Sequence, residues 1–486
     1  MKRLLSMTLG LLMSMTQVIA ETKITVLSDI HVMAPELIVN NGSAWQNYLA
    51  GKRTMLDNST QLFDELIPQL IADKPDLLLI TGDLTKDGEQ VSHQLVVKQL
   101  DRLRASGIRV LVIPGDHDLG TETAYIFDGD KTSPAKTVDS NAFAEMYQQY
   151  GYGASSDRDT ESLTYCCEPV DGLVVIGIAC DRHGRMSNST LSWVCNRAEK
   201  ARSEGKQVLA MMHFLLFPHV SNIEKTNEDY IVKDYETVRD RLIESGVRVV
   251  LTGHFHVQEI ARDLNDNLTG DIYEIITSST AAYPCGYRQM TLSNDKTKLS
   301  VKSKNITSLL GVPDFQNVAK ERLKEGTTNL FISEEVNSET AGDLVAQGFV
   351  IHAAGNEDKS SESQTYLTFY ELTQLVLRLT GVMNSKFDEL GLTWDFVNTT
   401  VRSMLTDTSR YGIPGREDRT DDLSVTIDLP KPTTGIHVVE SNQTIGKCYN
   451  LQGQQLITPP KGLYIQEGKL KMRKNPTEYR RVRGRR

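Results

Sequence analysis

Six short apolar runs between residues 24 and 252 predict β-strands, and five of them end in aspartate or histidine side chains. Each run is rich in leucine or β-branched residues and is bounded by polar residues or glycine. Between the runs, apolar side chains recur at helical spacing, as Leu62, Leu66 and Leu70 do. This alternation predicts an α/β layered domain. The predicted strands are residues 24–28, 77–81, 110–113, 173–179, 208–212 and 247–252.

The polar side chains that follow these strands are residue types that bind metals. In open α/β sheets, ligands bind beyond the carboxyl ends of the strands, so we expect these side chains to converge. Carboxylates together with imidazoles suit Mn, Fe or Zn ions. In Asp-x-His and His-x-His, both side chains lie on one side of an extended segment. Each motif alone is typical of a surface turn or a core histidine, but the ordered set favours a metal site. The set is Asp29, His31, Asp83, Asp116, His117, Asp118, His213, His254 and His256.

The order D-x-H, G-D, G-D-H-D, H, G-H-x-H resembles that of the calcineurin-like metallophosphoesterases, and the resemblance runs from Ile24 to Leu292. It extends to segments such as TGDLTKDGEQVSH and AAYPCGYRQMTL. The resemblance implies a layered β-sandwich of mixed sheets flanked by helices, and two divalent or mixed-valence metal ions (Mn, Fe or Zn). The implied ligands are Asp29, His31, Asp83 and His256 for one metal and Asp83, Asp116, His213 and His254 for the other, with Asp83 bridging.

The same resemblance implies roles near the substrate. His117 would lie beside the substrate phosphate and stabilise charge or protonate the leaving oxygen, and Asp118 would orient it. His219 and Arg288 lie in segments that match the family subgroup and are substrate-side candidates. Plain surface roles are equally open for these two residues.

Two positions depart from the family pattern. Asp116 stands where the family usually has asparagine, and Phe214 where relatives often have a second histidine. The extra negative charge of Asp116 predicts tighter metal retention and a less electrophilic site. Phe214 removes a polar group from near the cleft and leaves the substrate class open.

These features predict a secreted phosphoesterase that hydrolyses small phosphomonoesters or phosphodiesters by metal-activated hydroxide. The alternatives are a nuclease or protein phosphatase, or a non-catalytic binding protein stabilised by metals. The formal net charge of −10 argues against a surface that grips nucleic acid, so we expect no nucleic-acid partner. The presence of His117 favours an enzyme, because a purely structural metal site has no need for it.

Residues 1–20 are typical of a secretory signal peptide. Lys2 and Arg3 precede a mostly apolar run, and Ala20 is a small residue at the expected cleavage point. No later segment approaches ~20 apolar residues, so we expect no transmembrane segment in the mature chain. The sequence therefore predicts an exported protein that is periplasmic, on the cell surface or extracellular.

The remaining chain predicts further units after a phosphoesterase domain of residues 21–305. Residues 306–430 read as mainly helical, and residues 431–474 as a small β module. The pattern Y-x-L-x-G … G-L-Y-I … G-K-x-x-x-K in this module resembles the C-terminal sorting modules of exported Bacteroidota proteins. That resemblance implies the export machinery as a partner, while a plain β hairpin remains the alternative. Residues 475–486 form a basic tail.

Overall fold

The computed structural model describes most of the chain from residue 21 to residue 431. The predicted signal peptide and basic tail lie outside the described residues. The chain divides into two compact units, Met1–Thr433 and Thr434–Arg486, which are considered separately. The described residues are 21–221, 223, 228–265, 270–331, 339–355, 357, 361, 363–367, 399, 401–405, 421–431, 448–449, 455–456, 462–466 and 469–473.

The first sheet of the larger unit has the strand order β16-β15-β14-β1-β3-β4. Its three parallel strands β1, β3 and β4 carry the first three predicted motifs at their carboxyl ends. β14, β15 and β16 extend the sheet in antiparallel pairs. The bounds are β1 Thr22–Leu27, β3 Leu77–Ile80, β4 Arg109–Val112, β14 Gly286–Leu292, β15 Lys298–Asn305 and β16 Ser424–Asp428.

The second sheet has the strand order β12-β13-β11-β10-β9-β8-β7, with a parallel centre of β9, β10, β11 and β13. The last two predicted motifs follow β10 and β11. The bounds are β7 Asp157–Arg158, β8 Tyr165–Val170, β9 Leu173–Ile178, β10 Gln207–Met212, β11 Val249–Thr252, β12 Glu259–Leu264 and β13 Asp271–Ile276. A separate small sheet pairs β2 Ile38–Asn40, β5 Tyr125–Asp128 and β6 Lys131–Pro134.

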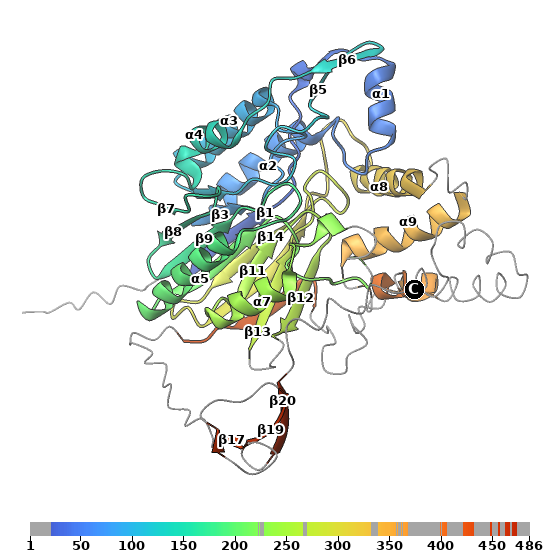
Figure 1. The fold of residues 1–486 in the computed structure, drawn as a ribbon. Helices are drawn as coiled ribbons and strands as arrows, with labels where there is room; N and C mark the ends of the chain where they lie inside the picture. Colours follow the sequence, from blue (N-terminus) through green and yellow to red (C-terminus); the bar gives the residue numbers. More distant parts are fainter. Residues whose placement is uncertain are drawn as a thin grey trace, which may run out of the picture. The chain divides into compact units, whose positions relative to one another are not determined.

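Helices cover the outer faces of the two sheets (Figure 1). Along β10, Leu209 belongs to the core shared with the first sheet and α2, whereas Ala210 packs in the core under α5. Because both faces of these strands are buried, their sequences are continuously apolar. This arrangement confirms the predicted layered sandwich of mixed sheets. The helices are α1 Ser43–Ala50, α2 Ser59–Asp73, α3 Gln90–Ala105, α4 Ser140–Met146, α5 Asn188–Ser203 and α7 Tyr235–Glu244, with short 3₁₀ turns at Pro35–Leu37, Gln148–Tyr150 and Glu228–Tyr230.

Two long helices, α8 Phe315–Phe331 and α9 Glu339–Ala354, follow the sheets in the segment predicted to be helical. The chain then returns to the first sheet as β16, a pairing that the sequence pattern did not predict. The smaller unit contains the short strands β17 Cys448–Tyr449, β18 Gln455–Leu456, β19 Gly462–Gln466 and β20 Lys469–Arg473 in one antiparallel sheet. None of the described helices is both long enough and apolar enough to cross a bilayer.

Candidate metal centre

The structure brings the seven predicted metal ligands together in two groups. Within each group, the potential ligand atoms lie within 4.8 Å of one another. Asp83 faces both groups, because Oδ1 lies 3.4 Å from His213 Nε2 and Oδ2 lies 3.6 Å from His31 Nε2. A carboxylate that presents one oxygen to each of two sites has the geometry of a bridging ligand. The groups are Asp83, Asp116, His213 and His254, and Asp29, His31 and His256.

The backbone at these ligands is strained. Non-glycine residues with positive φ are uncommon and concentrate at functional sites. The sequence pattern predicts that Asp29 and His31 reach one centre from an extended segment, but left-handed turns orient both side chains instead. These turns are held by the bonds from Asp29 N to Gly82 O and from His31 N to Asp83 O, both 3.0 Å. The positive φ values are 50° at Asp29, 44° at His31, 51° at Asp83, 67° at His254 and 63° at His256.

Glycines make room for the carboxylates. A Cβ atom at Gly115 would lie 2.2 Å from Asp83 Oδ1, and one at Gly253 would lie 2.5 Å from Asp29 Oδ2. Both distances are too short for any side chain. The glycines in the Gly-Asp and Gly-His motifs therefore allow the backbone to approach the carboxylates closely, in addition to permitting turns.

Backbone carbonyl groups orient two of the imidazoles. His213 Nδ1–H donates to Thr81 O at 2.8 Å, and His254 Nε2–H donates to Asp229 O at 3.1 Å. The other ring nitrogens, His213 Nε2 and His254 Nδ1, lie 3.0 and 3.1 Å from Asp116 Oδ1. A histidine whose second nitrogen is held in this way presents a fixed lone pair to a metal. The donor atoms present therefore fit the metal ions that the resemblance implies.

The charges at the centre favour a bound cation. Burial lowers the pKa of His213, but the carboxylates of Asp83 and Asp116 outweigh burial and raise this pKa well above its usual value. Burial lowers the pKa of His31 to about 4 despite the nearby Asp83, so this imidazole is a neutral donor at pH 7. A centre that attracts positive charge and offers a neutral imidazole at His31 is suited to Mn, Fe or Zn ions.

His117 lies beside the ligand groups but belongs to neither of them. Its side chain is 37% exposed, and its Nε2 lies 3.7 Å from Asp116 Oδ2. Its Nδ1–H donates to Asp87 Oδ1 at 2.8 Å. The prediction that Asp118 orients this ring is therefore wrong. Asp118 is fully buried and accepts hydrogen bonds from the backbone N–H groups of Leu84, Thr85 and Gly115 instead, at 3.0, 2.9 and 2.9 Å.

Replacing Asp87 by asparagine is expected to shift the alkaline limb of the pH profile to lower pH by about 1–3 units. Burial lowers the pKa of His117, but the carboxylates of Asp83, Asp87 and Asp116 outweigh burial and raise it to about 10. A general acid loses its proton as the pH rises through its pKa. Removing the Asp87 charge lowers the pKa of His117, so this proton is lost at a lower pH. The measurement is kcat/KM against pH, with the exposed Asp130→Asn as control. An unshifted alkaline limb would show that Asp87 does not set this pKa.

Asp116→Asn tests the effect of the extra negative charge. We expect metal affinity to fall by about 10–100-fold, because a carboxylate that contacts two ligand histidines loses its charge. At saturating metal, we expect kcat to rise, because the site becomes more electrophilic. Chelator competition gives the affinity, and steady-state assays with added Mn²⁺ give kcat. Unchanged values of both would refute the effect of this charge.

The two predicted substrate contacts lie elsewhere in the fold. Arg288 is fully buried, and its guanidinium donates to Glu259 O at 3.1 Å, to Ile276 O at 2.6 Å and to Asp422 O. The prediction that Arg288 contacts substrate is therefore wrong, since these bonds tie β14 to neighbouring backbone. His219 is also buried, and its ring packs on those of Phe255 and His352 at centroid distances of 5.1 and 5.3 Å. The predicted substrate contact of His219 is likewise not found, because the ring lies among these side chains and outside both ligand groups.

Arg288→Met is expected to destabilise the protein by about 3–5 kcal/mol, because it leaves several buried carbonyl groups without a donor. The free energy of unfolding from denaturant titration of the full chain measures this effect. Arg104→Met is the control, because the ion pair of Arg104 with Asp101 is exposed, and this substitution should cost under about 1 kcal/mol. Equal losses for the two variants would contradict the structural role of Arg288.

Comparison with known proteins agrees with this geometry. Residues 22–258 match the family model described as calcineurin-like phosphoesterase, a range that contains all seven predicted metal ligands. No curated protein sequence gives a significant match.

Among solved structures, the chain is similar to a dimetal phosphatase from Danio rerio. Identity is 12%, 58% of this chain and 96% of that chain are covered, and the TM-score is 0.41. It is also similar to a phosphopantetheinyl hydrolase from Mycobacterium tuberculosis, with 11% identity, 54% and 91% coverage and a TM-score of 0.26. On the family match, the chain contains a calcineurin-like phosphoesterase domain over residues 22–258 and is a metal-dependent phosphoric ester hydrolase.

Proposed function

We propose that the protein is an exported dinuclear-metal phosphoesterase that hydrolyses small phosphomonoesters or phosphodiesters. The observation that carries this proposal is the pair of ligand groups that meet at Asp83, with the exposed His117 beside them. Export is supported by the character of residues 1–20, and the resemblance of residues 448–474 to sorting modules supports the export machinery as a partner.

Several residues of this chain have distinct roles in the proposed hydrolysis. When bound, the two metal ions supply the positive charge that activates a water molecule as hydroxide and neutralises the phosphate oxygens. His117 Nε2 is placed to donate a proton to the leaving oxygen, while Asp87 holds Nδ1. His117 lines a cavity of about 210 Å³ together with His31 and His256. Lys52 and Arg53, which line the same cavity, add positive charge for phosphate oxygens.

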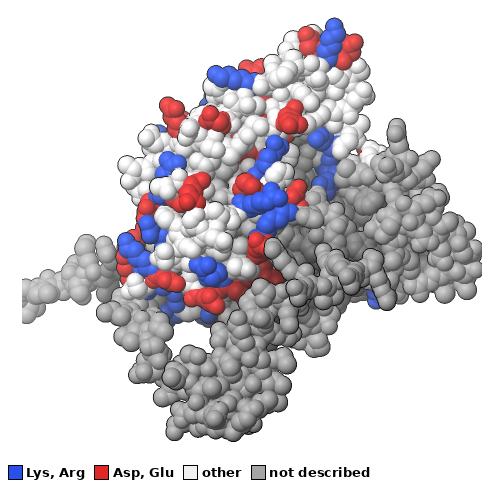
Figure 2. Space-filling model, in the orientation of Figure 1, with Lys and Arg blue, Asp and Glu red and all other residues white. Residues whose placement is uncertain are grey.

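The other functions considered have less support. A purely metal-stabilised binding protein has no use for an exposed histidine whose second nitrogen is held by a carboxylate. Figure 2 shows acidic and basic side chains interspersed over one face of the described residues. A nuclease needs a basic patch or stripe on its binding face, so this face does not favour that function.

A hydrolysis panel with added Mn²⁺ tests the proposed function. The substrates are p-nitrophenyl phosphate, bis-p-nitrophenyl phosphate, cyclic nucleotides and nucleoside phosphates, and His117→Ala is the control variant. Turnover that falls strongly in the variant would support the proposal. If no substrate were turned over, the binding-protein alternative would stand instead.

Export has a separate test in the native host. Cell fractionation combined with N-terminal sequencing should find the mature chain outside the cytoplasm, beginning at Glu21. An intact Met1 on a cytoplasmic protein would refute export and leave the enzymatic proposal untouched.

A further inference from the structure

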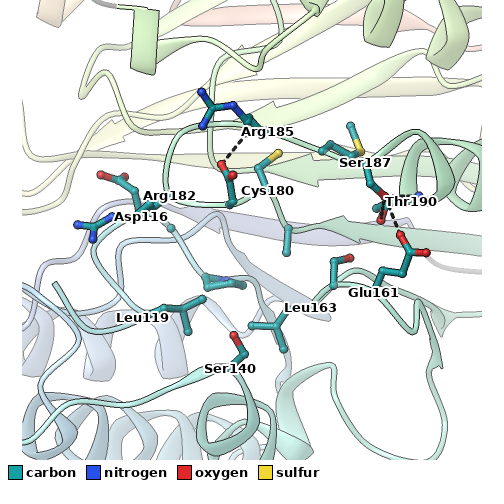
Figure 3. A pocket seen from close by; sticks show the side chains of 16 residues that line it. Asp116, Leu119, Ser140, Glu161, Leu163, Cys180, Arg182, Arg185, Ser187 and Thr190 are labelled. Atoms are coloured by element: carbon teal, nitrogen blue, oxygen red, sulfur yellow. Dashed lines mark hydrogen bonds between the residues drawn. The ribbon is translucent and has the colours of Figure 1, made fainter.

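Two cavities flank the metal-ligand groups, and they have no lining residue in common. One is the cavity of about 210 Å³ that contains His31, His117 and His256. The other has a volume of about 390 Å³, and Asp116 forms part of its wall (Figure 3). A phosphomonoester has one organic substituent and fills one such cavity, whereas a phosphodiester has two substituents. The smaller cavity borders the group of Asp29, His31 and His256, and the larger one borders the group that contains Asp116. A cavity beside each ligand group favours a diester.

The position of His117 distinguishes the two cavities. A proton donor for the leaving oxygen must face the leaving group, and His117 lines only the smaller cavity. The larger cavity borders Asp116, and His117 is not among the residues that line it. The larger cavity is therefore assigned to the substituent that stays on phosphorus.

The larger cavity is lined by apolar side chains and by two arginines. Leu119, Leu163 and Met186 line it, and Arg182 and Arg185 stand at its edge with exposed side chains. Figure 3 shows the Arg182 side chain on the same side of the cavity as Asp116. Within the described part of the chain, neither guanidinium forms an ion pair. An apolar wall with two available guanidiniums fits an organic group that carries an anion.

The acidic residues of this cavity are already bound to other groups. Asp181 Oδ1 accepts hydrogen bonds from the backbone N–H groups of His183 and Arg185, at 2.8 and 2.9 Å. Glu161 Oε2 accepts from the hydroxyl groups of Ser187, at 2.9 Å, and Ser189. These carboxylates therefore hold the loop and the start of α5 in place and leave the two guanidiniums available to a ligand.

The loop that carries both arginines is ordered by its own backbone. Asp181 N donates to Arg185 O at 2.9 Å, and Gly184 N donates to Asp181 O at 3.0 Å. Lys233 N donates to Gly184 O at 2.9 Å and ties the loop to the segment before α7. A rim held in this way loses little conformational entropy when it binds a ligand.

We propose that Arg182 and Arg185 select a small phosphodiester whose non-leaving substituent carries a second anionic group, and that both guanidiniums pair with that group. This inference rests on the proposed function, because the diester must be the substrate of the metal centre. It adds the substrate class, which the metal ligands themselves do not specify.

The test uses two substrates that differ by one anion. They are the p-nitrophenyl ester of thymidine 5′-phosphate and the same ester with an additional 3′-phosphate. Both release p-nitrophenol, so the ratio of their kcat/KM values reports only on the extra phosphate. We expect the wild-type protein to prefer the doubly charged ester by about 10-fold, and Arg182→Gln/Arg185→Gln to lower that ratio to about 1.

Arg197→Gln is the matched control, because Arg197 lies on α5, outside the cavity, and pairs with Asp157. It should keep the wild-type ratio. A ratio of about 1 in the wild-type protein would overturn the inference. A preference for the doubly charged ester that persisted in the double variant would overturn it as well. Hydrolysis of p-nitrophenyl phosphate but of neither diester would overturn it and leave the proposed function standing. Failure to hydrolyse these three substrates and every member of the hydrolysis panel above would overturn both proposals.

Discussion

Replacing Asp83 by asparagine is expected to lower kcat by about 10³-fold and to leave the protein with fewer than two bound metal ions per chain. The two oxygens of Asp83 face different ligand groups, at 3.4 Å from His213 and 3.6 Å from His31. Asparagine removes the shared negative charge and turns an N–H group towards one of the two sites. Metal content from elemental analysis and kcat with p-nitrophenyl phosphate measure the two effects.

Asp171→Asn is the matched control for this substitution. Asp171 is exposed in the turn between β8 and β9, where asparagine supports the same backbone conformation. This variant should keep both metals and full activity. If Asp83→Asn retained two metals and wild-type kcat, Asp83 would not be the bridging ligand.

His117→Ala is expected to lower kcat by about 10²–10⁴-fold without loss of metal. His117 is outside both ligand groups, and its ring is held at Nδ1 by Asp87, with Nε2 3.7 Å from Asp116 Oδ2. A proton donor matters most when the leaving group is a strong base. The loss should therefore be larger for alkyl phosphates than for p-nitrophenyl phosphate.

The comparison of alkyl phosphates with p-nitrophenyl phosphate within this one variant serves as the control. A merely structural role for His117 would reduce turnover of both classes of substrate by the same factor. Equal losses, or a loss of bound metal, would rule out proton donation and place His117 among the residues that hold the centre together.

Much of the fold could be predicted because the central strands are buried on both faces. The predicted strand 208–212 appears as β10 Gln207–Met212, and 173–179 as β9 Leu173–Ile178. Strands of this kind leave continuous apolar runs that are easy to read. The antiparallel β16 was not predicted, since it is only 5 residues long and its partner β15 lies more than 100 residues away.

The metal ligands could be predicted because their chemistry restricts the residue type. The hydrogen-bond partners of other site residues could not, because packing between distant segments decides them. A metal ligand must be a carboxylate or an imidazole, so Asp83 and His213 stand out in the sequence. The partner of His117 can be any nearby carboxylate, and the family resemblance implied Asp118, whereas the structure has Asp87. Arg288 was a substrate-side candidate because its segment matches the family subgroup. The sequence does not show that its guanidinium is buried among carbonyl groups.

The layered α/β class and the order of the metal-binding residue types could be read from the sequence, because both leave local patterns along the chain. Three further features became visible only in the folded chain: which oxygen of Asp83 faces which group, the bond between Asp87 and His117, and the cavity with Arg182 and Arg185 beside Asp116. These facts depend on left-handed backbone turns and on contacts between distant segments, whose energies are not encoded in any local pattern.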